Sequence, residues 1–207
     1  MEVSGLYYEG IYMSSLIISG DTSGQVTLAA PAVAGSNTLT LQAATATNAV
    51  NTLNTAVAST SGTSIDFTGL PSWIKRITVT LTGVSTSGTN SPQIQIGSGS
   101  VLTSGYTGIY STLTNAASVS SLSLSAGFRA GSYSGNTETN SGAFTLTLVG
   151  SNIWVCNAQV ANSSGYNSMG ICAGTVTLSG ALDRVRVTTV GSTDTFDAGT
   201  VNILYEG

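Results

Sequence analysis

Hydrophobic and polar residues alternate along most of the chain after Ser59, with the period of β-strands. In the segment IKRITVTLTGVST, residues 74–86, each second residue from Ile77 to Leu81 is aliphatic and threonines fill the places between them. Successive side chains of a strand point to opposite faces, so such a strand has one apolar and one hydroxyl-lined face. The pattern predicts strands at Thr63–Phe67, Lys75–Val84, Pro92–Gly97, Gly108–Leu113, Val119–Phe128, Ala143–Val149, Asn152–Val160, Gly170–Leu178, Arg184–Val190 and Gly199–Leu204.

Clusters of turn-forming residues separate these strands. SGTNSP, YSGNTETNSG and ANSSGYN are rich in Gly, Ser and Asn, which favour turns. About ten strands joined by such turns, with no long helical pattern, are typical of an all-β fold. We therefore predict an antiparallel β-sandwich or jelly-roll-like domain over residues 59–207.

Residues 1–58 have a different character. The first twenty are rich in Tyr, Ile and Leu, and short alternating strands are expected at Gln25–Leu28 and Thr38–Leu41. Within Ala43–Ala58 the apolar residues have helical spacing, but Thr and Asn are poor helix formers, so a short helix and a loop are both open. We interpret residues 1–58 as an extended segment with short strands that anchors the chain to another protein.

The chain carries unusually little charge, and this removes several classes of function. Lys and Arg number 5, Asp and Glu number 9, and histidine is absent, so no histidine-based catalytic or zinc site can form. Five cations and a net charge of −4 argue against nucleic-acid binding. No apolar run approaches the ~20 residues of a membrane helix, so no membrane insertion is expected. The first thirteen residues lack the basic start of a signal peptide, which indicates synthesis in a cytoplasm.

Four aspartates are the best candidates for acid chemistry: Asp66, Asp183, Asp194 and Asp197. A glycosidase needs two carboxylates about 5–10 Å apart. Aspartate more often caps turns by accepting backbone N–H bonds, and no calcium-loop spacing is present. We therefore expect no catalytic residues, no metal and no cofactor, and a protein that is not an enzyme.

Two cysteines, Cys156 and Cys172, fall on strands that would form one hairpin. If its turn is centred near Ser163–Gly165, the two cysteines lie opposite each other, close enough for a disulfide. Synthesis in a cytoplasm favours a buried cross-strand thiol pair over a bridge formed after release.

Aromatic side chains could stack on sugar rings or fill the core. Trp73 precedes an alternating strand, which favours a core role over a carbohydrate platform. Tyr133 and Tyr166 lie in Gly/Ser/Asn-rich turns, and exposed tyrosines of that kind suit surface recognition.

Three segments resemble virion proteins of tailed bacteriophages. GTSIDFTGLPSWIKRITVTLTGVSTSG (residues 62–88) and TLSGALDRVRVTTVGSTDTFDAGTVNILYEG (residues 177–207) are similar to a module of tail-fibre-type proteins. SGDTSGQVTLAAPAVAGSNTLTLQAAT (residues 19–45) resembles a segment that precedes such modules. The matches cover about half of the chain and contain no catalytic motif.

The resemblance implies a non-enzymatic structural protein on the virion surface, made in the host bacterial cytoplasm. The chain lacks an extended shaft, so a capsid decoration protein is an alternative to a tail fibre. A homo-oligomer, most often a trimer, is expected, with other virion subunits bound through the N-terminal segment. The alternative function is binding of a host receptor or surface glycan.

Overall fold

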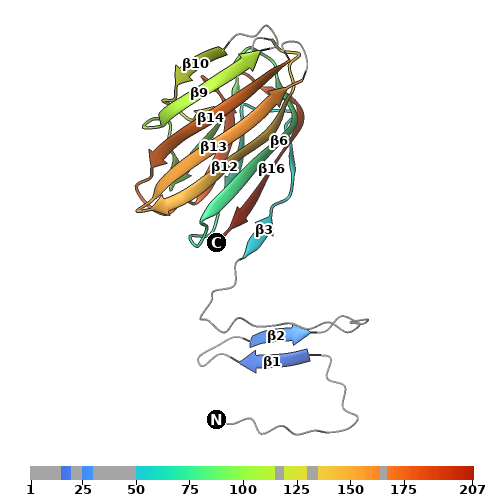
Figure 1. Ribbon diagram of the computed structural model, residues 1–207. Helices are drawn as coiled ribbons and strands as arrows, with labels where there is room; N and C mark the ends of the chain where they lie inside the picture. The colour runs from blue at the N-terminus through green and yellow to red at the C-terminus, as the bar shows by residue number, and fades with distance from the viewer. Residues whose placement is uncertain (1–14, 20–24, 30–49, 115–118, 130–134, 164–166) are drawn as a thin grey trace. The chain divides into compact units, whose positions relative to one another are not determined.

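The computed structural model describes six stretches of the chain: residues 15–19, 25–29, 50–114, 119–129, 135–163 and 167–207 (Figure 1). The chain divides into two compact units, Met1–Thr47 and Asn48–Gly207. In the first unit, β1 (Ser15–Ser19) pairs antiparallel with β2 (Gln25–Ala29). The strand expected at Gln25–Leu28 is therefore present, and the one expected at Thr38–Leu41 lies outside the described residues.

A large antiparallel sheet forms one layer of the second unit. In spatial order it contains β10 (Val119–Ser123), β9 (Thr107–Thr114), β14 (Ser168–Thr177), β13 (Ile153–Asn162), β12 (Asn140–Gly150), β6 (Arg76–Thr86), β16 (Phe196–Glu206) and β3 (Asn51–Leu53), and β4 (Val57–Ala58) also pairs with β16. Figure 1 shows β9, β14, β13, β12, β6 and β16 side by side across this layer.

A smaller antiparallel sheet forms the second layer. It contains β11 (Phe128–Arg129), β7 (Pro92–Ser98), β15 (Arg184–Thr189) and β5 (Ser64–Thr68), and β8 (Ser100–Val101) pairs with β7. Phe144 and Ile77 of the large sheet and Val185 and Ile94 of the small sheet are fully buried in one continuous core. The prediction of an all-β antiparallel sandwich is confirmed. Its finer description as a jelly roll stays a prediction.

The β12–β13 hairpin shows how a turn sets the register. Gly150 pairs with Ile153 across a two-residue turn, and both turn residues have positive φ, 48° at Ser151 and 59° at Asn152. That combination is a type I′ turn, whose twist matches the twist of the strands that it joins. The turn places Leu146 opposite Cys156 and Phe144 opposite Ala158, so that the large side chains face the core.

Two expectations need correction. The single strand predicted at Val119–Phe128 is two strands in different sheets, β10 and β11. The small residues Ser125, Ala126 and Gly127 between them let the chain cross from one layer to the other.

The second correction concerns residues 50–58, for which a helix or a loop was expected. These residues form β3 and β4, which pair with β16. They therefore belong to the sandwich unit, and the boundary between the units falls at residues 47 and 48 instead of 58 and 59.

Helices are absent from the stretches that the structure describes. Within those stretches, no helix is long and apolar enough to cross a membrane.

Candidate functional site: the outer face of the large sheet

The outer face of the large sheet is the broadest regular surface of the sandwich. Along β13, Trp154, Cys156 and Ala158 are buried toward the small sheet, so Asn157 and Gln159 point outward. The cross-strand register aligns these outward residues in rows. One row runs through Ser111, Ile171, Gln159, Ala143 and Thr80, and the next through Ile109, Ala173, Asn157, Thr145 and Thr78.

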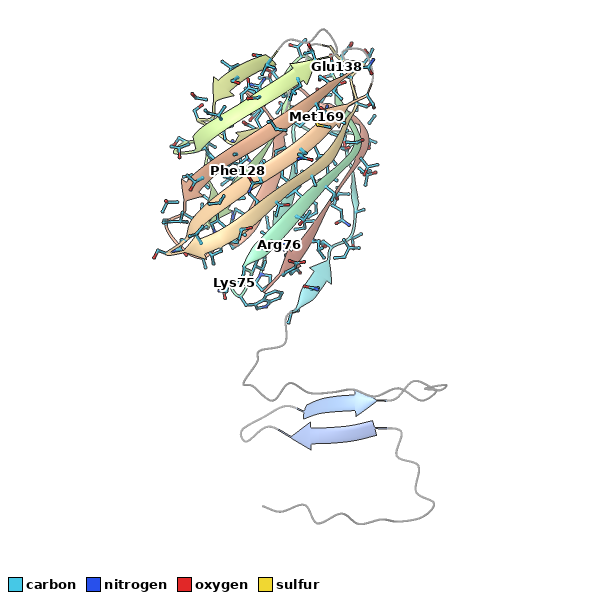
Figure 2. The ribbon with its side chains drawn as sticks, viewed as in Figure 1. Lys75, Arg76, Phe128, Glu138 and Met169 are labelled. Carbon is cyan, nitrogen blue, oxygen red and sulfur yellow. The ribbon has the colours of Figure 1, made fainter. Side chains whose placement is uncertain are left out.

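Ionic side chains are confined to the margins of this face. Among β9, β14, β13, β12, β6 and β16 there are three, and each lies within one residue of a strand end. Arg76 begins β6 and forms an ion pair of 2.9 Å with Glu206, which ends β16, and Asp197 is the second residue of β16. Figure 2 shows Arg76 toward the lower end of the sheet and Met169 farther up on β14. We call the outward surface of these six strands the neutral face.

The small sheet has the opposite character. Asp66 on β5 accepts two hydrogen bonds from Arg186 on β15, at 2.6 and 2.9 Å. Asp183 accepts two from Arg184, at 2.7 and 3.1 Å, and these hold the pKa of Asp183 below its ordinary value. The sandwich therefore has an ionic side and a neutral side.

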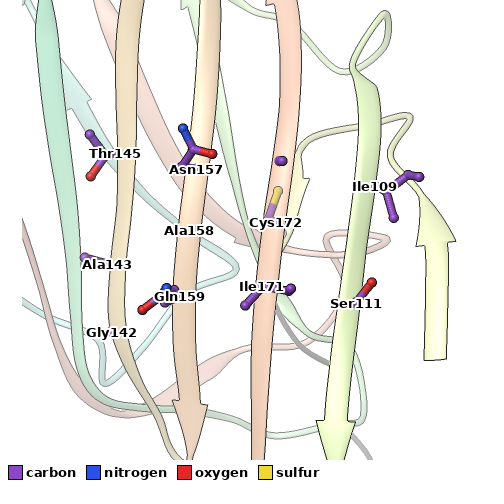
Figure 3. Close-up of a pocket in the computed structure, with 11 residues that line it drawn as sticks. Ile109, Ser111, Gly142, Ala143, Thr145, Asn157, Ala158, Gln159, Ile171 and Cys172 are labelled. Carbon is purple, nitrogen blue, oxygen red and sulfur yellow. The ribbon is translucent and has the colours of Figure 1, made fainter. Parts of the chain in front are cut away.

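An open depression of about 760 Å³ lies over β9, β14, β13 and β12 of the neutral face (Figure 3). Ile109 and Ile171 line it on β9 and β14, and Asn157 and Thr145 line it on β13 and β12. Ala143 and Ala173 lie within it, and their small side chains explain why the surface is hollow there. Amides and hydroxyls offer hydrogen-bond donors and acceptors around an apolar floor.

A ridge of apolar side chains stands on the depression's β9–β14 side. Ile109, Leu113, Met169 and Ile171 project from these two strands, and each is between 41% and 55% exposed. Leu113 and Met169 are directly opposite each other in the register. An isolated exposed apolar residue needs no explanation, but four on two neighbouring strands form a contiguous patch of the kind found at interaction sites. We call these four residues the apolar ridge.

The two cysteines lie beneath this face, on its core side. They occupy the neighbouring strands β13 and β14, and both are buried and free. The direct opposition expected from a turn centred at residue 164 is wrong. Cys156 pairs with Gly174 and Cys172 with Ala158, so the cysteines are diagonal neighbours. A hydrogen bond to Cys172 and burial raise the pKa of Cys156, so this thiol stays protonated.

Three of the four predicted acids have structural partners. Asp194 accepts hydrogen bonds from the backbone N–H of Asn90 at 2.8 Å and from its side-chain amide at 3.0 Å. Asp66 and Asp183 are held in their ion pairs, and Asp197 is exposed at the start of β16. No cluster of three metal-ligating residues occurs within the described stretches.

The aromatic residues do not form one platform. Trp154, Tyr106 and Tyr110 are buried in the core. Trp73, for which a core role was favoured, is 38% exposed and packs against Tyr205 with ring centroids 5.7 Å apart, so that expectation is wrong. Tyr133 and Tyr166, the predicted recognition residues, lie outside the described residues.

Sequence reasoning missed the neutral face because it looked for the apolar side of each strand. In SMGICAGTVT, residues 168–177, the outward positions Met169 and Ile171 are as apolar as the inward Cys172. The available signal was a strand with apolar residues at both its inward and its outward positions, because this pattern predicts that both faces of the sheet are covered.

Comparisons with known proteins add no identification. Neither a protein family, nor a curated protein, nor a solved structure matches the chain. The resemblance to phage virion proteins therefore stays a prediction.

Proposed function

We propose that this chain is a non-enzymatic structural protein of a bacteriophage virion, of tail-fibre or capsid-decoration type, that works as a homo-oligomer on the particle surface. The observation that carries the proposal is the neutral face. This face carries hydroxyls, amides and aliphatic groups, with ions only at its margins. Removing it from water therefore costs less free energy than removing a charged face. Such a face suits a permanent contact between subunits.

Other features support an assembly role over catalysis. Histidine is absent from the sequence, and three of the four candidate aspartates are engaged in ion pairs or a turn. Catalysis requires a nucleophile, a base and an orienting group that converge on one place. No such set surrounds the depression, whose polar residues are neutral amides and hydroxyls.

The number of subunits is proposed as three. Closed cyclic symmetry is the common arrangement for identical chains. The resemblance to phage fibre-type proteins favours a threefold axis, and that step is an analogy. In this proposal the N-terminal unit attaches the oligomer to other virion subunits.

Light scattering on the purified full chain tests the proposal. We expect a mass of three times 20.8 kDa at micromolar concentration. We also expect the chain among the proteins of purified particles after their salt wash. A monomer that is absent from particles would overturn the proposal.

Binding of a host surface glycan is the alternative function. The amides of Asn157 and Gln159 at the depression favour it, because amides commonly bind sugar hydroxyls through paired hydrogen bonds. A glycan array with the wild type and with Asn157→Ala tests it. A glycan bound by the wild type and lost in the variant would establish recognition. If no glycan on the array binds, the structural role remains as the only proposed function.

A further inference from the structure

Resting on the proposed structural role, we infer that the neutral face binds a second copy of this chain, and that the apolar ridge of one copy seats in the depression of the next. The inference assigns the contact to one of the two sides of the sandwich. It also specifies which strands meet across it.

The size of the neutral face fits a subunit interface. Strands lie about 4.8 Å apart and rise about 3.4 Å per residue, so six strands of about eight residues each cover on the order of 700 Å². A standard protein–protein interface buries about 800 Å² per partner. The face therefore has about the area of one side of a standard interface, and a ring divides this area between two neighbours.

The shape of the face supplies both halves of a fit. The apolar ridge stands on β9 and β14, whereas the far flank of the depression lies on β12 and β13. Seating Leu113 and Met169 in a neighbour's depression would cover their exposed side chains and would fill the space above Ala143 and Ala173. Leu113 and Met169 do not line the depression, so the patch that seats differs from the patch that receives it, and the contact is heterologous. A heterologous contact gives a ring when its rotation closes, and a closed ring of three is the form proposed here.

The chemistry of the face favours a copy of itself over a charged partner. Asn157 and Gln159 each carry a donor and an acceptor, so they can bond to the threonine and serine hydroxyls of the same face on a neighbour. A nucleic acid or a strongly acidic or basic protein would find no opposite charge there. The ionic small sheet would remain in water, where its ion pairs are solvated.

Substitution of one ridge residue tests which side of the sandwich makes the contact between copies. Met169→Asp places a charge in the middle of the proposed contact. Thr68→Asp is the matched control, because Thr68 is an exposed strand residue on the outer face of the small sheet. We expect Met169→Asp to weaken oligomerisation at least 100-fold and Thr68→Asp to change it less than threefold. Circular dichroism should show that both variants stay folded.

Cysteine cross-linking tests which strands meet. Met169 and Thr145 lie two strand spacings and four residues apart, about 17 Å within one chain, which exceeds the ~7 Å limit for a disulfide. A bridge between cysteines at these positions must therefore join two chains. The native thiols give little background because they are buried. Met169→Cys and Thr145→Cys should form covalent dimers under copper–phenanthroline only when mixed, and the double variant should form trimers.

The outcomes separate this inference from the proposed function. The inference would be overturned if Met169→Asp formed the same trimer as the wild type and if Met169→Cys and Thr145→Cys chains formed no disulfide with each other. The structural role would then still stand. Bridging of Met169→Cys with itself alone would show a symmetric contact and would overturn the ridge-in-depression fit. A monomeric wild type that binds particles in a Met169-dependent manner would identify a different virion subunit as the occupant.

Discussion

At the scale of single residues, Tyr106 is the clearest case of a polar group that the core requires. Its hydroxyl accepts a hydrogen bond from the backbone N–H of Ile96 at 2.8 Å and donates one to the carbonyl of Leu102 at 3.1 Å. Its ring meets Phe128 edge to face, with centroids 5.0 Å apart. Tyrosine corners in other sandwiches likewise return a hydroxyl to the backbone a few residues upstream.

Tyr106→Phe should lower the free energy of unfolding by about 1–3 kcal/mol, because it leaves the buried N–H of Ile96 without an acceptor. Urea denaturation of the wild type and the variant measures the difference. Tyr205→Phe is the control, because Tyr205 is only partly buried. An equal loss of stability in the two variants would contradict the role assigned to the Tyr106 hydroxyl.

The same residue predicts a dependence on alkaline pH. Burial raises the pKa of Tyr106 from 10.0 to about 12. The folded state therefore holds this proton more tightly than the unfolded state, and the stabilisation is complete below pH 10. It should fall by about 2–3 kcal/mol as the pH rises from 10 to 12. Denaturation at pH 9 and 11.5 should show this fall in the wild type, and a smaller one in Tyr106→Phe.

The cysteines should be chemically inert while the protein is folded. Both are buried, and burial keeps reagents away from them. The raised pKa of Cys156 also keeps its thiol protonated, whereas the hydrogen bond from Cys156 lowers the pKa of Cys172, so the inertness of Cys172 rests on burial. Ellman's reagent at pH 8 should react at least about 100-fold more slowly with the native chain than with the chain in 6 M guanidinium, where two thiols should appear. Two fast thiols in the native protein would contradict this.

At the scale of elements, the two-residue alternation predicted most of the strands, because half-buried strands express their two faces directly in sequence. It failed at Val119–Phe128, where the break is made by three small residues with no Pro or Asn to mark a turn. It also predicted the wrong partner for Cys156, since a hairpin's register depends on its turn. Cys156 pairs with Gly174, two residues beyond the partner Cys172 that a turn centred at residue 164 would give.

The β12–β13 turn offers a stabilising change. Ser151 and Asn152 both adopt positive φ, which costs free energy for most residues, whereas Asn-Gly is the preferred pair for a type I′ turn. The double change Ser151→Asn and Asn152→Gly should raise the free energy of unfolding by about 1 kcal/mol. Thermal denaturation checks it. The contrasting double change, Ser151→Gly with Asn152→Val, should be destabilising because a β-branched residue at position 152 resists positive φ.

At the scale of the whole molecule, the sequence predicted the class of fold but neither the assignment of strands to sheets nor the candidate site. Sheet order depends on contacts between segments far apart in the chain, such as β6 with β16, and alternation carries no record of the partner. The neutral face depends on that order, because Ile109, Ile171 and Asn157 become neighbours only when β9, β14 and β13 are adjacent. The low number of charges was visible in the composition, whereas the position of the charges at the strand ends of the neutral face was not.

The boundary between the two units gives the last prediction. All described core residues lie between Ile65 and Ile203, so residues 48–207 should fold alone with the stability of the full chain. A shorter fragment, 59–207, should be less stable by at least about 2 kcal/mol, because several backbone hydrogen bonds along β16 are lost. Those bonds include Val50 N–H to Gly207 O at 3.0 Å and Asn54 N–H to Ile203 O at 2.9 Å.

The pair of fragments also separates folding from attachment. Without β3 and β4 the β16 edge is unpaired, and an unpaired edge promotes aggregation, so 59–207 should precipitate at concentrations where 48–207 stays in solution. Residues 48–207 keep the neutral face and should still form trimers, yet they should fail to join particles because the proposed anchor is missing. Denaturation, light scattering and particle binding measure the three properties separately. Equal stability of the two fragments would refute the boundary at residue 47, and particle binding by 48–207 would refute the anchor.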